Sequence, residues 1–373
     1  MPPTLDIALV NTTASDIYAT ITGLDLDNNN AWFVLKSDGR TAYHPTSPSN
    51  IGTPLAEDCA IKLGEQGATR TVTIPHIAGG RIYFSVDKPL TFLLNPGPAL
   101  VEPSVTNPSD PNINIRWGFC EFTFNAAQLY ANISYVDFVG VPVAIALTNE
   151  AGDTKKVAGM PANGLETVSA GLESQSSADG LGWKELIVKD AEGRPLRALS
   201  PNQGCVMNPN LFANYYEPYV DEVWSRFRSM PMTIDTQAAG VVQGKVDGDQ
   251  LTFEDQSFNK PSTRDIFNAS SGPFQTGPDA KRNAIIPRLN AEFHRSTYLN
   301  GDTFPAHPDR YYKHNITNHY ARIVHAANID GRGYAHPYDD ATPSGASDQS
   351  GFVNDPNPKL LTVVVGGGGG GGR

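Results

Sequence analysis

Residues 117–125 read Trp-Gly-Phe-Cys-Glu-Phe-Thr-Phe-Asn and predict a β-strand whose two faces differ in character. Successive side chains of a strand point to opposite sides of the sheet, so one face of this strand is apolar. Its members are Cys120, Phe122 and Phe124. The opposite face carries a carboxylate, Glu121, followed by two hydrogen-bonding side chains, Thr123 and Asn125. The strand is therefore expected to cover a core with one face and to offer a polar surface on the other.

A second carboxylate follows in the next predicted strand, Ile133–Leu147, where Asp137 lies between apolar neighbours. If this strand pairs antiparallel with Ile115–Asn125 about a connection near Leu129, Glu121 and Asp137 lie opposite one another. Like charges in that arrangement destabilise a sheet. Close carboxyl groups also share a proton readily, and glycoside cleavage needs a protonated acid beside an ionised base. Taken alone, such a pair more often belongs to a solvated outer surface than to a catalytic site.

The sequence around these strands is rich in turns and poor in charge. The chain has 35 glycines and 29 prolines, and charged residues make up 18%, below an average of about 25%. Short β-branched and aromatic segments bounded by turn residues are typical of a sandwich or barrel. The predicted strands are Ile17–Thr22, Ala31–Leu35, Arg70–Ile74, Arg81–Val86, Glu166–Val168, Trp183–Lys189, Tyr320–His325 and Leu360–Val365.

The pattern changes after residue 205. Apolar residues at spacings of three and four predict amphipathic helices over Pro209–Ser229 and Asn283–Tyr298. Between them, Gly240–Phe253 predicts a hairpin that turns at residues 247–249. We therefore predict an inserted α/β domain at residues 206–317, within a β domain formed by residues 1–205 and 318–365. The glycine run and final arginine of residues 366–373 predict a disordered tail.

Charge and cysteine content disfavour several classes of function. The 373-residue chain has a formal net charge of −11 at pH 7, so phosphate backbones and anionic lipid repel it, and we expect no nucleic-acid partner. The longest stretch without charged or strongly polar residues, Val139–Leu147, is far shorter than the roughly 20 residues of a membrane-spanning helix. Three cysteines, Cys59, Cys120 and Cys205, cannot form a disulfide framework. Cys120 is predicted to be a buried, unreactive thiol.

Three segments resemble a known superfamily. Residues 121–125 (Glu-Phe-Thr-Phe-Asn) and 133–143 (Ile-Ser-Tyr-Val-Asp-Phe-Val-Gly-Val-Pro-Val) are similar to the acidic-cleft segment of thaumatin-like proteins. Residues 333–342 (Gly-Tyr-Ala-His-Pro-Tyr-Asp-Asp-Ala-Thr) resemble that superfamily's Tyr-Ala-Tyr-Asp-Asp-Ala-Thr-Ser signature. With the predicted insert and few cysteines, residues 1–365 resemble glycoside hydrolase family 64. The members of that family are β-1,3-glucanases, including laminaripentaose-producing enzymes, and they consist of a thaumatin-like domain with an added α/β domain.

The resemblance implies a fold class and a mechanism. The fold is expected to be mainly β, a thaumatin-like β-sandwich or barrel domain with an inserted mixed α/β domain and a groove between them. Glu121 and Asp137, 16 positions apart, match the general acid and general base of an inverting hydrolysis. Their carboxyl groups should then stand roughly 6.5–9.5 Å apart, which requires a diagonal offset or a bend between the strands. Thr123, Asn125 and Tyr130 are expected to line the glucan groove.

Two groups of residues leave alternatives open. Asp339 and Asp340 could coordinate an ion or bind a sugar hydroxyl, or they could form an Asx-turn before Thr342. Histidines gather in the last third of the chain, but their spacing fits no metal motif, so hydrogen-bonded structural roles are favoured and we expect neither metal nor cofactor. They are His294, His307, His314, His319, His325 and His336. Trp183 and Trp224 lie in apolar patterns and are predicted to be core residues.

Three functions are consistent with these residues. The favoured one is an inverting endo-β-1,3-glucanase, a monomer that acts on β-1,3-glucan polysaccharide and releases short laminarioligosaccharides. The second is a non-catalytic thaumatin-like protein that binds β-1,3-glucan, and the third is a metal-dependent hydrolase. The resemblance implies secretion, whereas Met1–Asp6 lacks the basic and apolar regions of a signal peptide, so a cytoplasmic location stays open.

Overall fold

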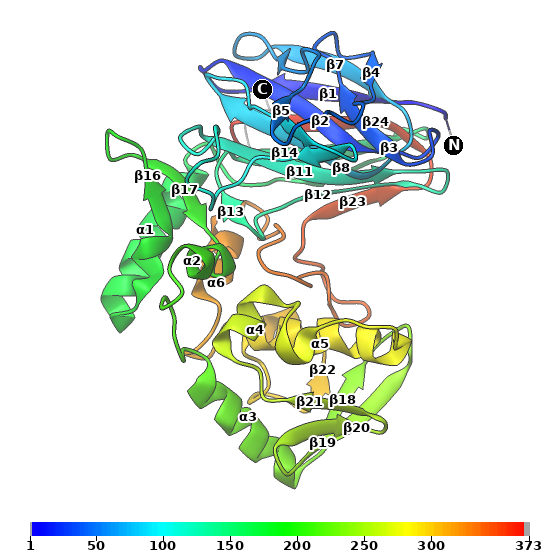
Figure 1. Ribbon diagram of the computed structural model, residues 1–373. Coiled ribbons are helices and arrows are strands. Elements are labelled where there is room, and N and C mark those ends of the chain that lie inside the picture. The colour runs from blue at the N-terminus through cyan, green and yellow to red at the C-terminus, as the bar shows by residue number, and fades with distance from the viewer. Residues whose placement is uncertain (1, 369–373) are drawn as a thin grey trace.

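Two lobes joined by a helical layer make up the computed structural model, which describes residues 2–368 (Figure 1). The upper lobe contains most of the strands, and the first and last described strands, β1 and β24, both lie in it. The chain leaves this lobe and returns to it, since β24 (Pro358–Val365) pairs in parallel with β1 (Leu5–Asn11). The lower lobe, made from the middle of the chain, is a smaller sheet covered by helices.

The upper lobe is built on two sheets that share one apolar core. The five-stranded sheet has the order β15 (Thr154–Val157), β14 (Val143–Asn149), β24, β1 and β7 (Thr69–Ile74). The eight-stranded sheet has the order β23 (Phe352–Asp355), β12 (Leu129–Ile133), β11 (Trp117–Phe124), β8 (Ile77–Val86), β2 (Ile17–Asp25), β3 (Ala31–Leu35) and β4 (Ala42–Tyr43), with β6 (Ile61–Lys62) beside β2. These elements confirm most of the predicted N-terminal strands.

Two small sheets border the sandwich. One has the order β10 (Ala99–Val101), β9 (Leu93–Asn95) and β5 (Thr53–Pro54), and the other has the order β13 (Phe138–Val139), β17 (Pro195–Leu199) and β16 (Ile187–Lys189). The predicted strand over residues 133–147 is therefore wrong, because β12, β13 and β14 divide it. Gly140 explains the break, since a Cβ there would lie 1.9 Å from the carbonyl oxygen of Trp117. The backbone passes too close to β11 at this point for a regular strand.

Helices stand where two strands were predicted, and these predictions are wrong. Residues 166–168 belong to α1 (Gly164–Asp179), and residues 320–325 belong to α6 (His319–Ala327). Buried residues at helical spacing, Leu165, Val168 and Leu172, turn α1 toward the core, where it packs against α6. In α6, Asn318 accepts a hydrogen bond from the Ala321 N–H and caps the helix. Tertiary packing and this cap outweigh the β propensity of the Tyr, Ile and Val residues.

The rest of the helical layer connects the lobes. The 3-10 helix Gly182–Leu186 covers most of the predicted strand 183–189, of which only the end forms β16. Trp183 in this 3-10 helix is fully buried, which confirms its prediction as a core residue. The helix α2 (Pro201–Met207) follows β17 and leads into the lower lobe.

The lower lobe has one sheet with helices packed around it. The sheet order is β21 (Gln256–Asn259), β20 (Gln250–Phe253), β19 (Val241–Asp247), β18 (Met232–Asp235) and β22 (Thr303–Phe304). The helices are α3 (Glu217–Ser229), α4 (Thr263–Asn268) and α5 (Ala280–Arg295). Short 3-10 helices lie at Gly272–Phe274 and Pro308–Arg310. The predicted hairpin is confirmed, with Asp247 opposite Gln250. Trp224 is 2% exposed and is a core residue, as predicted.

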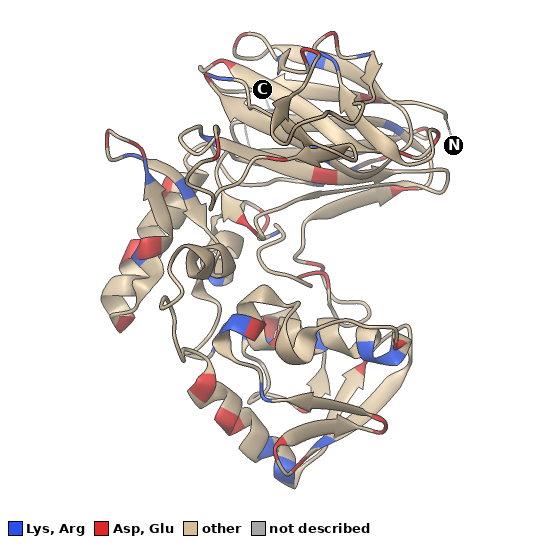
Figure 2. Ribbon diagram, in the orientation of Figure 1, with Lys and Arg blue, Asp and Glu red and all other residues tan. Residues whose placement is uncertain are grey.

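The start of α3 and the distribution of charge along it can be compared with the prediction. The predicted helix 209–229 is shorter than expected, because residues 209–216 form turns before α3 begins at Glu217. Glu217 lies in the first turn of α3, and Arg226 and Arg228 lie in the last, which complements the helix dipole. Figure 2 shows this separation on α3, where acidic residues in red precede basic residues in blue.

The predicted disorder of the C-terminal glycines is wrong in part. The N–H of Gly366 donates to the Pro142 carbonyl at 2.9 Å, and the N–H of Gly368 donates to the Met160 carbonyl at 2.8 Å. The expectation of a disordered tail is therefore wrong for residues 366–368. The remaining residues of that predicted tail, 369–373, lie outside the described residues.

Candidate active site

Glu121 lies in the middle of the eight-stranded sheet. On β11 it stands opposite Arg81 of β8 and Asn132 of β12, so both cross-strand neighbours are polar. The Arg81 Nε donates to Glu121 Oε1 at 3.2 Å, and the Asn132 amide donates to Oε2 at 3.5 Å. As predicted, Glu121 and Thr123 are partly exposed, whereas the alternate residues of the strand are buried. Glu121 is therefore held in place by its neighbours on both sides.

Arg81 connects Glu121 to a further carboxylate. Its NH1 donates to Glu102 Oε2 at 2.9 Å, and its guanidinium lies 5.0 Å from the centre of the Phe119 ring. Burial raises the pKa of the neighbouring Tyr83 far above its ordinary value, so this phenol stays protonated at neutral pH. Glu102, like Glu121, is about one-third exposed. One arginine therefore stands between two carboxylates.

Asp137 lies in a bend and not in a strand, so the expected pairing of Glu121 with Asp137 is wrong. The residue opposite Glu121 is Asn132, because the turn between β11 and β12 comes before Leu129, which already pairs with Phe124. Phe138 fixes the bend by packing edge-on against Trp117 with 4.6 Å between ring centres. The bend itself agrees with the expected offset between the two carboxylates.

The helix α2 holds Asp137 through both its backbone and its side chain. The N–H of Ser200, the N-cap of α2, donates to the Asp137 carbonyl at 2.8 Å. The Gln203 amide donates to Asp137 Oδ1 at 2.7 Å. Among the described residues, these are the polar partners recorded for Asp137. Asp137 also lines the second of the two cavities described next, as Gln203 does.

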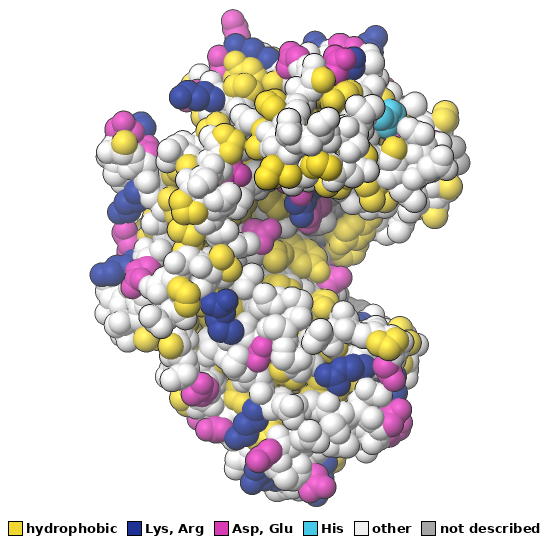
Figure 3. All heavy atoms as spheres, viewed as in Figure 1, with side chains coloured by type: hydrophobic (Ala, Val, Ile, Leu, Met, Phe, Trp, Pro, Cys, Tyr) yellow, Lys and Arg dark blue, Asp and Glu magenta, His cyan; other side chains and the backbone are white. Residues whose placement is uncertain are grey.

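Two adjoining cavities contain the two carboxylates. The first, about 380 Å³, contains Glu121 and the second, about 280 Å³, contains Asp137. Arg81 and Glu102 line both of them. Figure 3 shows a deep hollow between the lobes with apolar side chains inside it. The cavities together can hold a polar ligand longer than one sugar unit.

The predicted groove residues do not all reach the cavities. Thr123 and Tyr130, which stand opposite one another on β11 and β12, line the Glu121 cavity. The Tyr130 ring is stacked on Phe352 of β23, with centres 5.1 Å apart. Asn125 is not among the lining residues. Its side chain instead accepts the N–H groups of Ala127 and Gln128, and so it stabilises the turn after β11.

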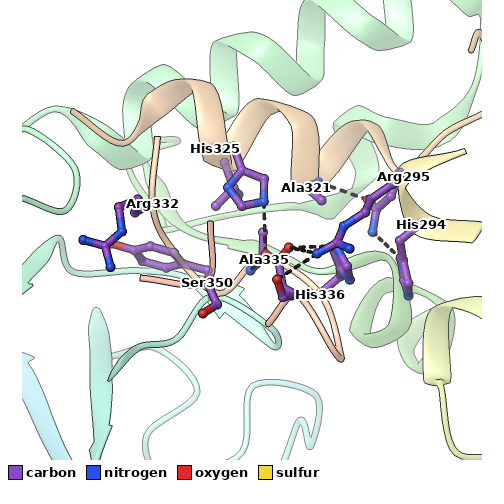
Figure 4. A network of polar contacts seen from close by, with 12 residues as sticks. His294, Arg295, Ala321, His325, Arg332, Ala335, His336 and Ser350 are labelled. Atoms are coloured by element: carbon purple, nitrogen blue, oxygen red, sulfur yellow. Dashed lines mark hydrogen bonds and ion pairs between the residues drawn. The ribbon is translucent and has the colours of Figure 1, made fainter. Parts of the chain in front are cut away.

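Asp339 is fully buried, so of the alternatives left open for it, direct contact with a sugar hydroxyl does not fit its position. Its Oδ1 lies 3.0 Å from His336 Nε2 and 3.3 Å from Arg295 NH2, and its Oδ2 lies 3.0 Å from His325 Nε2. Burial opposes ionisation, but the facing histidines hold the pKa of Asp339 well below its usual range. Figure 4 shows Arg295, His325 and His336 converging from different segments of the chain. Asp340, in contrast, is exposed.

The histidines form hydrogen bonds, as the favoured interpretation predicted. The Asn318 amide donates to His294 Nδ1 at 2.8 Å, and His294 stacks on His336 with ring centres 4.4 Å apart. Burial and the adjacent His336 lower the pKa of His294 well below its ordinary value. His319 contacts the Asn315 carbonyl at 2.9 Å. Among residues 2–368, no group of three or more His, Cys, Asp or Glu side chains is arranged to hold a metal ion.

Several residues of the site were missed in the sequence. Arg81 was placed in a predicted strand, and pairing of that strand with residues 117–125 would have brought it beside Glu121. Trp32 lines the Glu121 cavity from β3, and nothing in its local pattern distinguished it from a core residue. Glu102 and Gln203 come from a loop and a short helix with no motif, so only the folded chain brings them to the cavities. All three cysteines are buried and unpaired with one another.

None of the helices in residues 2–368 has the length and apolar character needed to cross a membrane.

Known proteins share this architecture. A family model described as β-1,3-glucanase matches residues 3–365. Two curated relatives, each called glucan endo-1,3-beta-glucosidase, come from Cellulosimicrobium cellulans and from Arthrobacter sp. (strain YCWD3). Each is 29% identical to this chain over 379 residues, which include 97% of the chain. The chain spans 65% of the length of each of these relatives.

Solved structures are similar over nearly the whole chain. A laminaripentaose-producing β-1,3-glucanase in complex with laminaritetraose superposes with a TM-score of 0.87 at 28% identity, covering 98% of this chain and 99% of the other. A β-1,3-glucanase domain (GH64) from Clostridium beijerinckii shares the fold, with a TM-score of 0.76 at 21% identity over 97% of this chain and 98% of the other.

Proposed function

The chain belongs to glycoside hydrolase family 64, the β-1,3-glucanases, and we propose that it is an endo-β-1,3-glucanase that releases short laminarioligosaccharides from laminarin or curdlan. The observation that carries the proposal is a pair of carboxylates in adjoining cavities with different surroundings. Glu121 lies beside Arg81 and Asn132, whereas Asp137 lies beside Gln203. Arg81 and Glu102 line both cavities, and a sugar ring and a water molecule are proposed to bind where the cavities adjoin.

The proposed reaction is a single displacement with inversion. Glu121 donates a proton to the glycosidic oxygen, so that the departing sugar leaves as an alcohol. Asp137 accepts a proton from a water molecule that attacks the anomeric carbon from the opposite face. This division of roles requires roughly 6.5–9.5 Å between the carboxyl groups. The Gln203 bond to Oδ1 leaves Asp137 Oδ2 to bind the water.

The walls of the cleft suit a neutral chain of sugars. Thr123 offers a hydroxyl, and Tyr130 and Trp32 offer aromatic faces in the Glu121 cavity. Burial, Asp340 and Asp348 raise the pKa of Tyr130, so its phenol stays protonated and can donate a hydrogen bond. Asp340 is exposed and is proposed to accept hydrogen bonds from sugar hydroxyls. Asn125 is proposed to act indirectly, through the turn that precedes Tyr130.

We assign the two walls of the groove to two domains. Residues 1–205 and 318–365 would form the thaumatin-like β domain, and residues 206–317 would form the inserted α/β domain. The sandwich in the upper lobe and the separate sheet in the lower lobe support this division. The helices α1 and α6 lie within the first of these domains, and α2 crosses the boundary between the two.

Hydrolysis of laminarin tests the proposal against the two other candidate functions. The wild-type protein is expected to release reducing sugar from laminarin and curdlan, with oligosaccharides as products, and EDTA is expected to leave the rate unchanged. The assay measures reducing ends over time, and a pull-down with insoluble curdlan measures binding separately. Binding without product would support the non-catalytic glucan-binding protein, and a rate lost with EDTA would support the metal hydrolase.

A further inference from the structure

Asp137 needs a partner that fixes its side chain, because it lies in a bend. A residue in the middle of a strand has neighbours on both sides, as Glu121 does, but Asp137 has none of this support. In the described part of the chain, the recorded partner of its carboxylate is Gln203, at 2.7 Å from Oδ1. Both residues line the same cavity. Gln203 therefore lies where it can orient the Asp137 carboxylate.

Gln203 is itself well anchored. Ser200 caps α2, and its side chain accepts the Gln203 N–H at 3.4 Å. Gly204 faces Leu186 so closely that a Cβ there would lie 2.3 Å from it. At the end of the helix, the Arg264 guanidinium donates to the Cys205 carbonyl at 2.7 Å, which ties α2 to α4 of the lower lobe. The position of Gln203 thus depends on contacts with both lobes.

The chemistry of an amide suits this place. An amide N–H donated to a carboxylate stabilises its ionised form, which is the form that a general base requires. A glutamine does not titrate, so it does not compete with Asp137 for the proton of the attacking water. Because the bond occupies Oδ1, the proton is received at Oδ2.

On the basis of the proposed function, we propose that Gln203 is a positioning residue for the general base, which orients the Asp137 carboxylate through the bond to Oδ1. It acts through Asp137 and not on the sugar. Its contribution belongs to the chemical step, so its loss should lower kcat much more than it changes KM.

The experiment compares Gln203→Met, which keeps the length of the side chain but removes the donor, with Gln203→Glu, which places a second carboxylate beside Asp137. In the methionine variant kcat on laminarin is expected to fall about 10- to 100-fold with KM nearly unchanged, since a hydrogen bond to a charged group is lost. The acid limb of the kcat/KM profile should move to higher pH, and further in Gln203→Glu. The matched control is Gln250→Met, which removes a bond to Asn259 in the lower lobe at 2.9 Å.

The outcomes separate this inference from the proposed function. Thermal unfolding of each variant should match the wild type, so that the rates report on folded protein. If kcat and the pH profile of Gln203→Met stay within twofold of the wild type, or if only KM rises, the inference is wrong while the hydrolase remains. If the wild-type protein releases no sugar, the proposed function itself fails.

Discussion

Replacing Glu121 by glutamine is expected to lower the rate of laminarin hydrolysis by about two to four orders of magnitude, while laminarin still binds. Glutamine has the size of glutamate and can still accept the Arg81 hydrogen bond, but it has no proton to give to the leaving oxygen. Asp137→Asn is expected to have an effect of similar size, because an amide cannot take a proton from water. The measurement is kcat and KM from reducing-sugar release, with binding followed by curdlan pull-down.

A surface variant provides the control for these two changes. Glu173→Gln removes a carboxylate of α1 that is 53% exposed and lies 3.5 Å from Lys189. Its rate should equal that of the wild type. Turnover within about tenfold of the wild type in either Glu121→Gln or Asp137→Asn would refute the assigned role of that residue.

The second large effect is expected on stability, at Asp339. Its carboxylate is fully buried and lies within 3.3 Å of three cationic or titratable side chains, Arg295, His325 and His336. It also accepts the Ala335 N–H at 2.9 Å. Asp339→Ala would leave the fully buried Arg295 without this partner, and losing one member of a buried pair lowers the free energy of unfolding by about 3–5 kcal/mol.

Denaturant unfolding of the wild type and of Asp339→Ala measures this difference in the free energy of unfolding. Asp339→Asn keeps the shape of the side chain and part of its hydrogen bonding, so it should be destabilised less and provides a soluble variant if the alanine protein does not fold. The control is Asp221→Ala, an exposed residue paired with Lys260, whose effect should stay within about 0.5 kcal/mol. An unchanged unfolding midpoint in Asp339→Asn together with folded, stable Asp339→Ala would contradict this account.

The strands of the upper lobe were predictable because their pattern is local. Alternation in residues 117–125 correctly gave the buried and the partly exposed faces of β11, and with them the orientation of Glu121. The same logic failed after Ile133, since the course of the chain there depends on the contact of Gly140 with the Trp117 carbonyl, two residues far apart in sequence. For Asp137, the sequence allowed only the expectation that its carboxyl group is offset from that of Glu121.

Helices buried on most sides were harder to predict. In α6, nearly every residue from His319 to His325 is buried, and Ile323 and Val324 have a high β propensity. The strand was predicted from this propensity, although the apolar residues of the segment recur at helical spacing. The buried role of Asp339 also left no signal, because its partners Arg295 and His325 lie on different helices. The proposed role of Gln203 was equally hard to predict, because it depends on Asp137, which lies 66 positions away in the sequence.

The stereochemistry of hydrolysis tests the central claim most directly. Laminarihexaose mixed with the wild-type protein in D₂O can be followed by proton NMR at the anomeric positions before mutarotation equilibrates the products. If Glu121 and Asp137 act as acid and base in a single displacement, the α-anomer of the new reducing end appears first and the β-anomer grows later. A β-anomer that appears first would contradict the account, because it would require a covalent intermediate.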